Sequence, residues 1–278
     1  MLRKLKNSLF LIYIVLATFL VTLPLFHIIF SVFINGFPVI LKAGLSFLTE
    51  TLPPPGEELA GIGPAILGTF ILTFLSSLIG IPIATLAGIY AAEYPNSFFS
   101  RATRTLLLVM IEFPTILVSL FVMSIVVLPM GRFSAIAGAI ALVIVMMPYV
   151  AVYTEQALKS VPERYREAAY ALGLKRKQVV FRVMFSIARK GIVTGFLIGI
   201  AKAAGETAPI LFTAGGAYRT FFIGLDKPVG AIPLLIYDLV QQPYSNYHEI
   251  AWGSALILLI VFLAIFIPVR LSVREVKL

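Results

Sequence analysis

Residues 9–34 read LFLIYIVLATFLVTLPLFHIIFSVFI, a run of 26 residues without a charged side chain. A helix that crosses a bilayer needs about 20 predominantly apolar residues, so this run is long enough to span. A secretory signal has an apolar core of only about 7–15 residues, followed by a small-residue cleavage site. This run is longer and shows no clean cleavage pattern, so we interpret it as a retained first membrane helix.

Similar apolar runs recur along the whole chain. Backbone groups in lipid must bond within the segment, which favours helices, and no period-2 alternation indicates a barrel. The sequence therefore predicts an all-α polytopic membrane protein of six transmembrane helices, forming one transmembrane domain over residues 1–278. The predicted spans are 9–34, 63–92, 105–129, 134–154, 191–213 and 250–269.

The composition supports the same class. Of the 278 residues, 60% are hydrophobic and only 13% are charged, whereas soluble domains carry about 25% charged residues. Cysteine is absent, which excludes disulfides and cysteine-ligated metals. The only histidines, His27 and His248, are expected to be structural. We therefore expect neither a metal site nor a cofactor in this chain.

The distribution of basic residues predicts the orientation. With the N-terminus inside, seventeen of the 22 Lys and Arg residues fall in cytoplasmic segments and four in outer segments, and Lys202 lies within a span. Both termini are therefore predicted to be cytoplasmic. The net charge of +9 follows from membrane topology, so we expect no nucleic-acid partner.

The cytoplasmic connection 155–190 carries the clearest helix signals outside the spans. Residues 160–163, Ser-Val-Pro-Glu, fit a capping box, and Gly173 is a natural stop. The helix between them is amphipathic, with one face formed by Tyr165, Ala168, Ala169 and Leu172. Such a helix suits a partner's groove, although the nine basic residues of the connection would equally favour lipid headgroups.

The fifth predicted span contains two opposite charges, Lys202 and Glu206. Either charge at the bilayer centre costs about 2.5–3.5 kcal/mol, so the pair must face protein or a watery path. It is either an ion pair that locks helices together or part of a translocation path. Pro209 cannot donate to the carbonyl of Gly205, so we expect a kink or hinge there.

Two further charged residues lie in or near the third span. Glu112, before Pro114, is an intramembrane acid that would pair with a cation on another helix. Arg132, at the outer end of this span, could attract anions or extend to lipid headgroups.

One motif resembles a known family. Glu167-Ala168-Ala169, followed after three residues by Gly173, is similar to the EAA loop of bacterial ABC-importer permeases. Where that family continues with Ile-x-Leu-Pro, residues 183–186 here read Val-Met-Phe-Ser, without the proline. The resemblance implies a coupling helix seated in a groove of an ATPase subunit. The implied coupling residues are Glu167, Ala168, Ala169, Leu172 and Gly173, and Tyr165 joins them because it lies on the same face of the predicted helix.

A second resemblance concerns the fifth span. Residues 204–209, Ala-Gly-Glu-Thr-Ala-Pro, followed by Ile-Leu-Phe-Thr-Ala, are similar to the fifth helix of the PstA family of phosphate permeases. Gly61–Thr69 resembles that family's entry into the second helix. The resemblance implies a type I ABC importer permease fold that imports inorganic phosphate by alternating access. Lys202 stands where the family commonly has arginine, and the implied path residues are Lys202, Glu206, Thr207 and Pro209.

The resemblance also implies partners and a location. These are a second, PstC-like permease subunit, two PstB-like ATPase subunits that use ATP and Mg, a PstS-like extracytoplasmic phosphate-binding protein, and membrane lipid. The location is a bacterial or archaeal plasma (inner) membrane.

Three alternative functions are compared with the sequence and its motifs: an enzyme, a permease for another oxyanion, and a secondary transporter. An enzyme is not supported, because no Walker loop, HExxH or GxSxG pattern occurs. A permease for another oxyanion, sulfate or molybdate, would carry the same EAA loop. A secondary transporter would need no docking loop, and no convincing internal repeat favours one.

Overall fold

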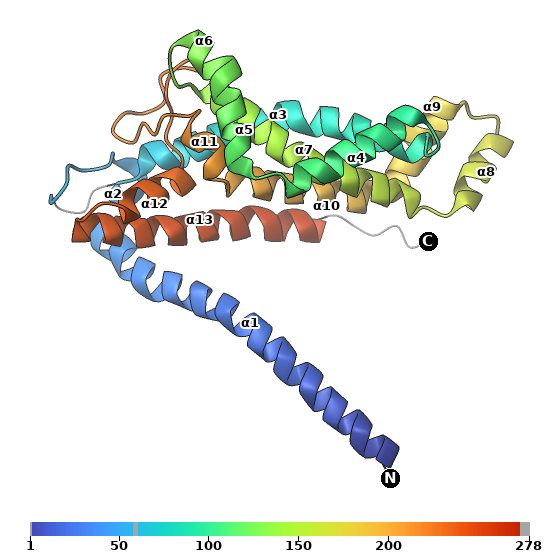
Figure 1. The fold of residues 1–278 in the computed structure, drawn as a ribbon, viewed down its shortest axis with the longest axis horizontal. Helices are drawn as coiled ribbons and strands as arrows, with labels where there is room; N and C mark the ends of the chain where they lie inside the picture. Colours follow the sequence, from blue (N-terminus) through green and yellow to red (C-terminus); the bar gives the residue numbers. More distant parts are fainter. Residues whose placement is uncertain (1, 58–60, 273–278) are drawn as a thin grey trace.

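The computed structural model describes residues 2–57 and 61–272 and is almost entirely helical (Figure 1). Five of the described helices are long and apolar enough to cross a membrane, and a bent pair makes a sixth if it is one span. In chain order the elements are α1 (Leu2–Ala43), α2 (Ser46–Thr49), α3 (Gly63–Glu93), α4 (Phe98–Glu112), α5 (Thr115–Val122), η1 (Met123–Val127), α6 (Leu128–Met130), α7 (Ala135–Lys159), α8 (Glu163–Ala171), α9 (Arg176–Gln178), η2 (Val179–Met184), α10 (Phe185–Ala204), α11 (Ala208–Leu211), α12 (Ile232–Val240) and α13 (Ser245–Ser272).

The third predicted span, 105–129, differs from a straight helix. The chain breaks after Glu112, and α4 makes an angle of 103° with the segment Thr115–Met130. Phe113 takes an extended conformation, with φ −73° and ψ 130°. The ring of Pro114 disfavours the helical conformation of the residue before it, which accounts for the break at this position.

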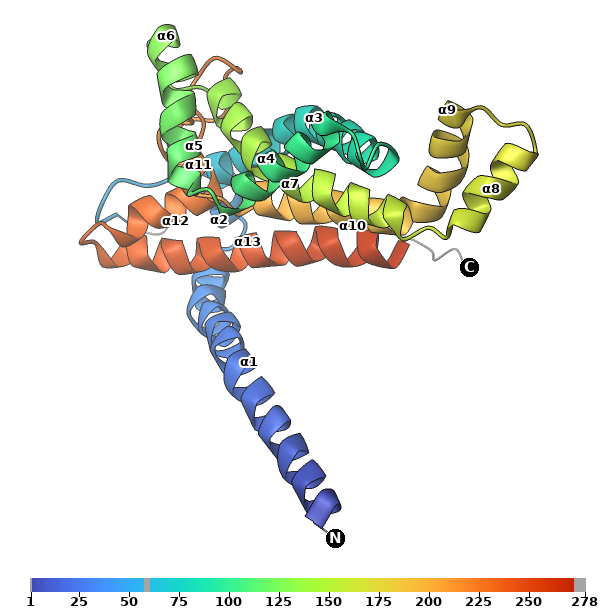
Figure 2. The ribbon, with the colours of Figure 1, turned by 45° about the vertical axis from the view of Figure 1, so that its right-hand side comes forward.

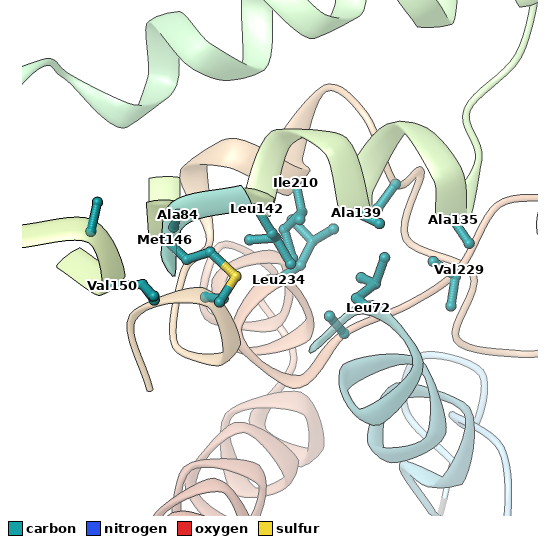
Figure 3. Close-up of a cluster of buried hydrophobic side chains, with 14 of the residues drawn as sticks. Leu72, Ala84, Ala135, Ala139, Leu142, Met146, Val150, Ile210, Val229 and Leu234 are labelled. Atoms are coloured by element: carbon teal, nitrogen blue, oxygen red, sulfur yellow. The ribbon is translucent and has the colours of Figure 1, made fainter. Parts of the chain in front are cut away.

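Helix α7 lies between α3 and α10 and contacts both through small residues. A Cβ atom added to Gly195 of α10 would lie 2.6 Å from the Cβ of Tyr153, and one added to Gly88 of α3 would lie 2.5 Å from the carbonyl oxygen of Ala151. The glycines at these positions therefore allow the helix backbones to approach closely. Figure 3 shows the buried cluster around α7, in which Leu142 and Met146 of α7 join Leu72 and Ala84 of α3.

The elements separate into two ends (Figures 1 and 2). Helices α8 and α9 lie at one end of the bundle, and α2, α6 and α12 lie at the other. Helix α1 contacts α13 near its own C-terminal end and then projects away from the bundle. Its N-terminus points toward the α8 end, as expected if both lie on one side of the membrane. Arg274 and Lys277, which contributed to the predicted orientation, lie outside the described residues.

Candidate coupling and translocation sites

The predicted docking helix is present as α8. It ends where expected, because Gly173 has a φ of +76°, a conformation that favours glycine. The amide of Leu174 donates to the carbonyl of Ala169 at 3.2 Å and closes the turn. The predicted capping box is wrong. Pro162 is the N-cap residue, and the Ser160 hydroxyl donates to the carbonyl of Ala157 in the preceding helix.

The predicted apolar face of α8 is divided between two environments. Ala169 is 4% exposed and packs with Tyr165 against the protein's own cluster around η2. Leu172, in contrast, is 82% exposed, and Ala168 and Glu167 are also exposed. One side of α8 is thus fixed to the bundle, and a second side is free to meet another surface.

Glu93, the last residue of α3, holds the α8 segment in place. Its side chain is 3% exposed and accepts two hydrogen bonds from the Arg166 guanidinium, at 2.7 and 2.8 Å. The bond to Glu93 raises the pKa of Arg166 above its ordinary value. Arg176 donates to the Glu93 carbonyl at 2.9 Å, and its guanidinium lies 4.1 Å from the ring centroid of Tyr94. We call these four residues the Glu93 clamp.

Sequence reasoning did not identify the Glu93 clamp. Glu93 and Arg166 are 73 positions apart, so no helical spacing connects them. A signal was available, however. Glu93 ends a long apolar run at the predicted cytoplasmic surface, where basic residues dominate. An acid at such a place requires a cationic partner if it is buried.

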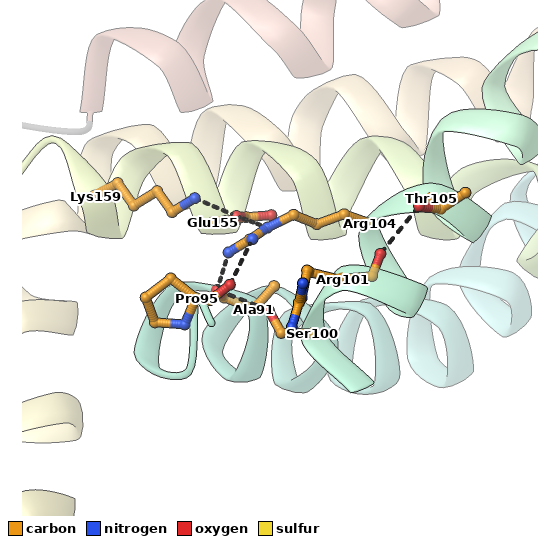
Figure 4. A network of polar contacts seen from close by, with 8 residues as sticks. All are labelled: Ala91, Pro95, Ser100, Arg101, Arg104, Thr105, Glu155 and Lys159. Atoms are coloured by element: carbon orange, nitrogen blue, oxygen red, sulfur yellow. Dashed lines mark hydrogen bonds and ion pairs between the residues drawn. The ribbon is translucent and has the colours of Figure 1, made fainter. Parts of the chain in front are cut away.

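A second buried acid, Glu155, joins α3, α4 and α7 through Arg104 and Lys159 (Figure 4). Its carboxylate accepts from Arg104 and from Lys159, each at 2.5 Å. Arg104 also donates to the backbone carbonyls of Ala91 and Pro95 at the end of α3. The neighbouring ends of three helices are therefore joined by charge-assisted hydrogen bonds.

Lys202 and Glu206 form the ion pair that their spacing predicts. Their backbone differs from one continuous helix, because α10 ends at Ala204 and Gly205 is its C-cap. The Glu206 side chain is 10% exposed and that of Lys202 is 37% exposed. The Lys202 ammonium lies 5.9 Å from the ring centroid of Tyr149 on α7. The lysine is thus the more accessible member of the pair.

Pro209 stands at the start of a new helix and does not kink an existing one. It lies in the first turn of α11, where its missing N–H costs nothing. Its carbonyl accepts from the Thr213 hydroxyl at 2.8 Å, and the Phe212 amide donates to Ser119 of α5 at 3.1 Å. Thr207, the N-cap of α11, is partly buried beside this junction. The helical break is therefore packed against α5.

The remaining candidate residues lie away from this pair. Glu112 is exposed at the last position of α4. Arg132 pairs with Asp226 of the connection between α11 and α12 at 3.0 Å, and both side chains are about half exposed. His27 lies on exposed α1, and a ring nitrogen of His248 lies 2.8 Å from the Gln242 carbonyl oxygen. Within residues 2–57 and 61–272, no group of three His, Asp or Glu could hold a metal.

Comparisons with known proteins agree with this geometry. A family model for the "Binding-protein-dependent transport system inner membrane component" matches residues 84–276. The "Probable phosphate transport system permease protein PstA" of Methanocaldococcus jannaschii is 56% identical and covers 98% of this chain and 95% of its own. The PstA protein of Pasteurella multocida is 38% identical, with 96% of each chain covered.

Solved structures show the same fold. A chain of the MetNI methionine ABC transporter, in an inward facing conformation, superposes with a TM-score of 0.58 at 20% sequence identity. The superposition covers 77% of this chain and 94% of that chain. The fold and the family match define a polytopic, all-α permease of the type I ABC importer class.

The chain belongs to the family of binding-protein-dependent transport system inner membrane components and, within it, to the PstA permeases. It is therefore a multi-pass inner-membrane component of a transporter and not an enzyme.

Proposed function

We propose that this chain is a permease subunit of an ATP-driven importer that carries inorganic phosphate into the cytoplasm by alternating access. The observation that carries the cargo assignment is the 56% identity, over almost the full chain, to a protein named as a phosphate permease. The expected partners are a second, PstC-like permease subunit, two PstB-like ATPase subunits and a PstS-like binding protein. ATP and Mg are used by the ATPase subunits.

The proposed coupling surface is the free side of α8. Leu172, Ala168 and Glu167 are exposed at the end of the molecule that carries the most basic residues. An apolar side chain beside a carboxylate on a short, rigid helix suits a groove in a partner protein. Tyr165 and Ala169 hold the helix from behind, and Gly173 ends it.

The proposed path includes Lys202, Glu206, Thr207 and Pro209. The lysine would offset the negative charge of phosphate, and the glutamate would keep the lysine in place and prevent tight trapping of the anion. The accessibility of Lys202 relative to Glu206 supports these roles, because the cation is the member that an anion could reach. Binding must remain weak enough for release.

The test is reconstitution of the purified assembly in liposomes, with labelled phosphate uptake measured against sulfate and molybdate. We expect ATP-dependent phosphate uptake that the competitors do not reduce. Uptake of another oxyanion would overturn the cargo assignment. Uptake driven by an ion gradient, without a copurifying ATPase, would overturn the importer assignment.

Lys202→Ala tests the path. We expect an assembly of normal composition whose phosphate uptake falls about tenfold or more, a change equivalent to about 1.4 kcal/mol at the limiting step. Lys42→Ala is the matched control, because Lys42 is an exposed lysine at the end of α1. Full transport by Lys202→Ala would exclude this lysine from the path.

A further inference from the structure

The Glu93 clamp joins α3 to the docking segment, residues 160–184, although the two are far apart in the sequence. The docking segment is continuous in sequence with α7 on one side and with α10 on the other. Helix α3 ends at Glu93, 70 positions before α8 begins at Glu163, yet the Glu93 side chain bonds Arg166 of α8 directly. A movement of α8 therefore reaches α3 through side chains.

The strength of this connection follows from its geometry. A fork-to-fork pair between a guanidinium and a carboxylate fixes both distance and direction. The carboxylate is 3% exposed, so water offers it little replacement for the arginine. Arg176 adds a bond to the Glu93 backbone and lies over the Tyr94 ring. The end of α3 is thus held by both halves of the docking segment.

The other end of α3 is fixed to the outer loops. The Thr69 hydroxyl accepts a hydrogen bond of 2.8 Å from the Ile232 amide, at the start of α12. A Cβ added to Gly68 would lie 1.8 Å from the carbonyl oxygen of Gly230, so helix and loop backbones are in direct contact. From Thr69 to Glu93 a helix spans about 36 Å. Helix α3 therefore joins the cytoplasmic docking segment to the outer end (Figure 1).

We propose that Glu93 is a positioning residue that couples α8 to α3, so that movement of the docking helix is passed along α3 to the outer loops. The inference rests on the proposed function, because it assigns α8 to the ATPase contact. When the ATPase moves α8, the clamp carries α3 with it, and α3 moves the Gly230–Ile232 backbone at the outer end. Without the clamp, the assembly still hydrolyses ATP but moves less phosphate for each ATP.

The test is Glu93→Gln in the complete reconstituted assembly, with phosphate uptake and ATP hydrolysis measured on the same liposomes. The amide keeps the size of the side chain and loses its charge. We expect the amount of phosphate moved per ATP to fall about fivefold or more, the lower range of measured coupling between sites. A wild-type ratio in Glu93→Gln overturns the proposal.

Glu155→Gln is the matched control. It makes the same chemical change in a second buried acid at the same end of the bundle, but its partners are Arg104 and Lys159 and not α8. We expect an unchanged ratio of phosphate to ATP. An equal loss of the ratio in this control would mean that any buried acid at this end has the effect, and would overturn the specific role of Glu93.

Arg166→Lys provides a second variant if Glu93→Gln does not assemble. It keeps the positive charge but cannot form the two-bond fork. We again expect a reduced ratio, and an unchanged ratio overturns the proposal. A merely structural role would lower the amount of assembled protein without changing transport per ATP.

A cargo-independent measurement separates this proposal from the proposed function. The chain contains no cysteine, so spin labels can be placed at introduced cysteines at Lys42 and Thr220, two exposed outer positions. We expect ATP to change their separation in the wild type and not in Glu93→Gln. If ATP still changes the label separation in Glu93→Gln, the proposed role of Glu93 is overturned. If the wild type hydrolyses ATP but moves no phosphate, only the cargo assignment is overturned.

Discussion

A single carboxylate, Glu155, accepts hydrogen bonds from two cations on different helices. We predict that Glu155→Gln lowers the free energy of unfolding by about 1–3 kcal/mol, because Arg104 loses its charged partner. The loss of unfolding free energy is smaller than for a fully buried ion pair, because water can reach the Arg104 side chain, which is 27% exposed. Thermal unfolding in detergent measures the change. The exposed Glu249→Gln is the control, and an equal melting temperature for both variants contradicts the prediction.

The contact between Tyr218 and Asp238 predicts a dependence on pH. Burial raises the pKa of Asp238 above its ordinary value of 3.8, although the Tyr218 hydroxyl, which donates to it at 2.7 Å, acts in the opposite direction. A raised folded pKa stabilises the protein below the unfolded pKa, and this contribution is lost as pH rises through the folded pKa. Asp238→Asn should therefore gain stability relative to the wild type as pH rises above about 4.

Melting temperatures of both proteins across this pH range test the prediction. Tyr218→Phe removes the hydrogen bond that lowers the Asp238 pKa, so it should move the pH-dependent change to higher pH. A difference between wild type and Asp238→Asn that is constant with pH would show that Asp238 has the same pKa in the folded and unfolded protein.

Individual residues differ in how far sequence could predict their contacts. Lys202 and Glu206 are four positions apart, and intramembrane charge demands a partner, so their pairing was predictable. Glu93 and Arg166 meet only because α3 and α8 come together in the fold. Both are ordinary charged residues in sequence, and their connection depends on tertiary structure.

At the scale of helices, close contact between α7 and α10 depends on glycine. A Cβ at Gly195 would lie 2.6 Å from the Tyr153 Cβ, so Gly195→Ala must push the helices apart. We predict a loss of about 1–3 kcal/mol of stability, as for other overpacked interiors. Gly205→Ala is the matched control, because its Cβ would lie 3.4 Å from the Ala201 oxygen. Equal unfolding temperatures for the two variants would contradict the prediction.

The helices also show what limits prediction of elements. Apolar length located the spans, and the boundaries of α3 agree with the sequence within about two residues. The sharp turn at Pro114 was not expected, because a proline in a membrane helix is often accommodated by its neighbours. The predicted fifth span continues to residue 213, whereas α10 ends at Ala204. The helix ends earlier because the segment that follows it packs against α5.

The described part of the molecule has one end at which Arg104, Arg166 and Arg176 form ion pairs and another end of irregular loops, and α3 extends between them. Most side chains of residues 9–43 are exposed, although the segment is apolar. In a membrane this helix must meet lipid or another apolar surface, because apolar side chains are stabilised by leaving water. The orientation of the two ends decides whether α8 can reach a cytoplasmic ATPase.

Labelling with a membrane-impermeant maleimide tests this orientation, since the wild-type chain has no cysteine. A cysteine at Thr220, an exposed outer-loop position, should react in intact cells. A cysteine at Leu172, which is 82% exposed, should react only after the membrane is opened. The Leu172 site should then be protected when the ATPase subunit is added, because its side chain lies on the free side of α8. Reaction of Leu172→Cys in intact cells would reverse the orientation and remove α8 from the cytoplasm, and with it the proposed coupling to ATP.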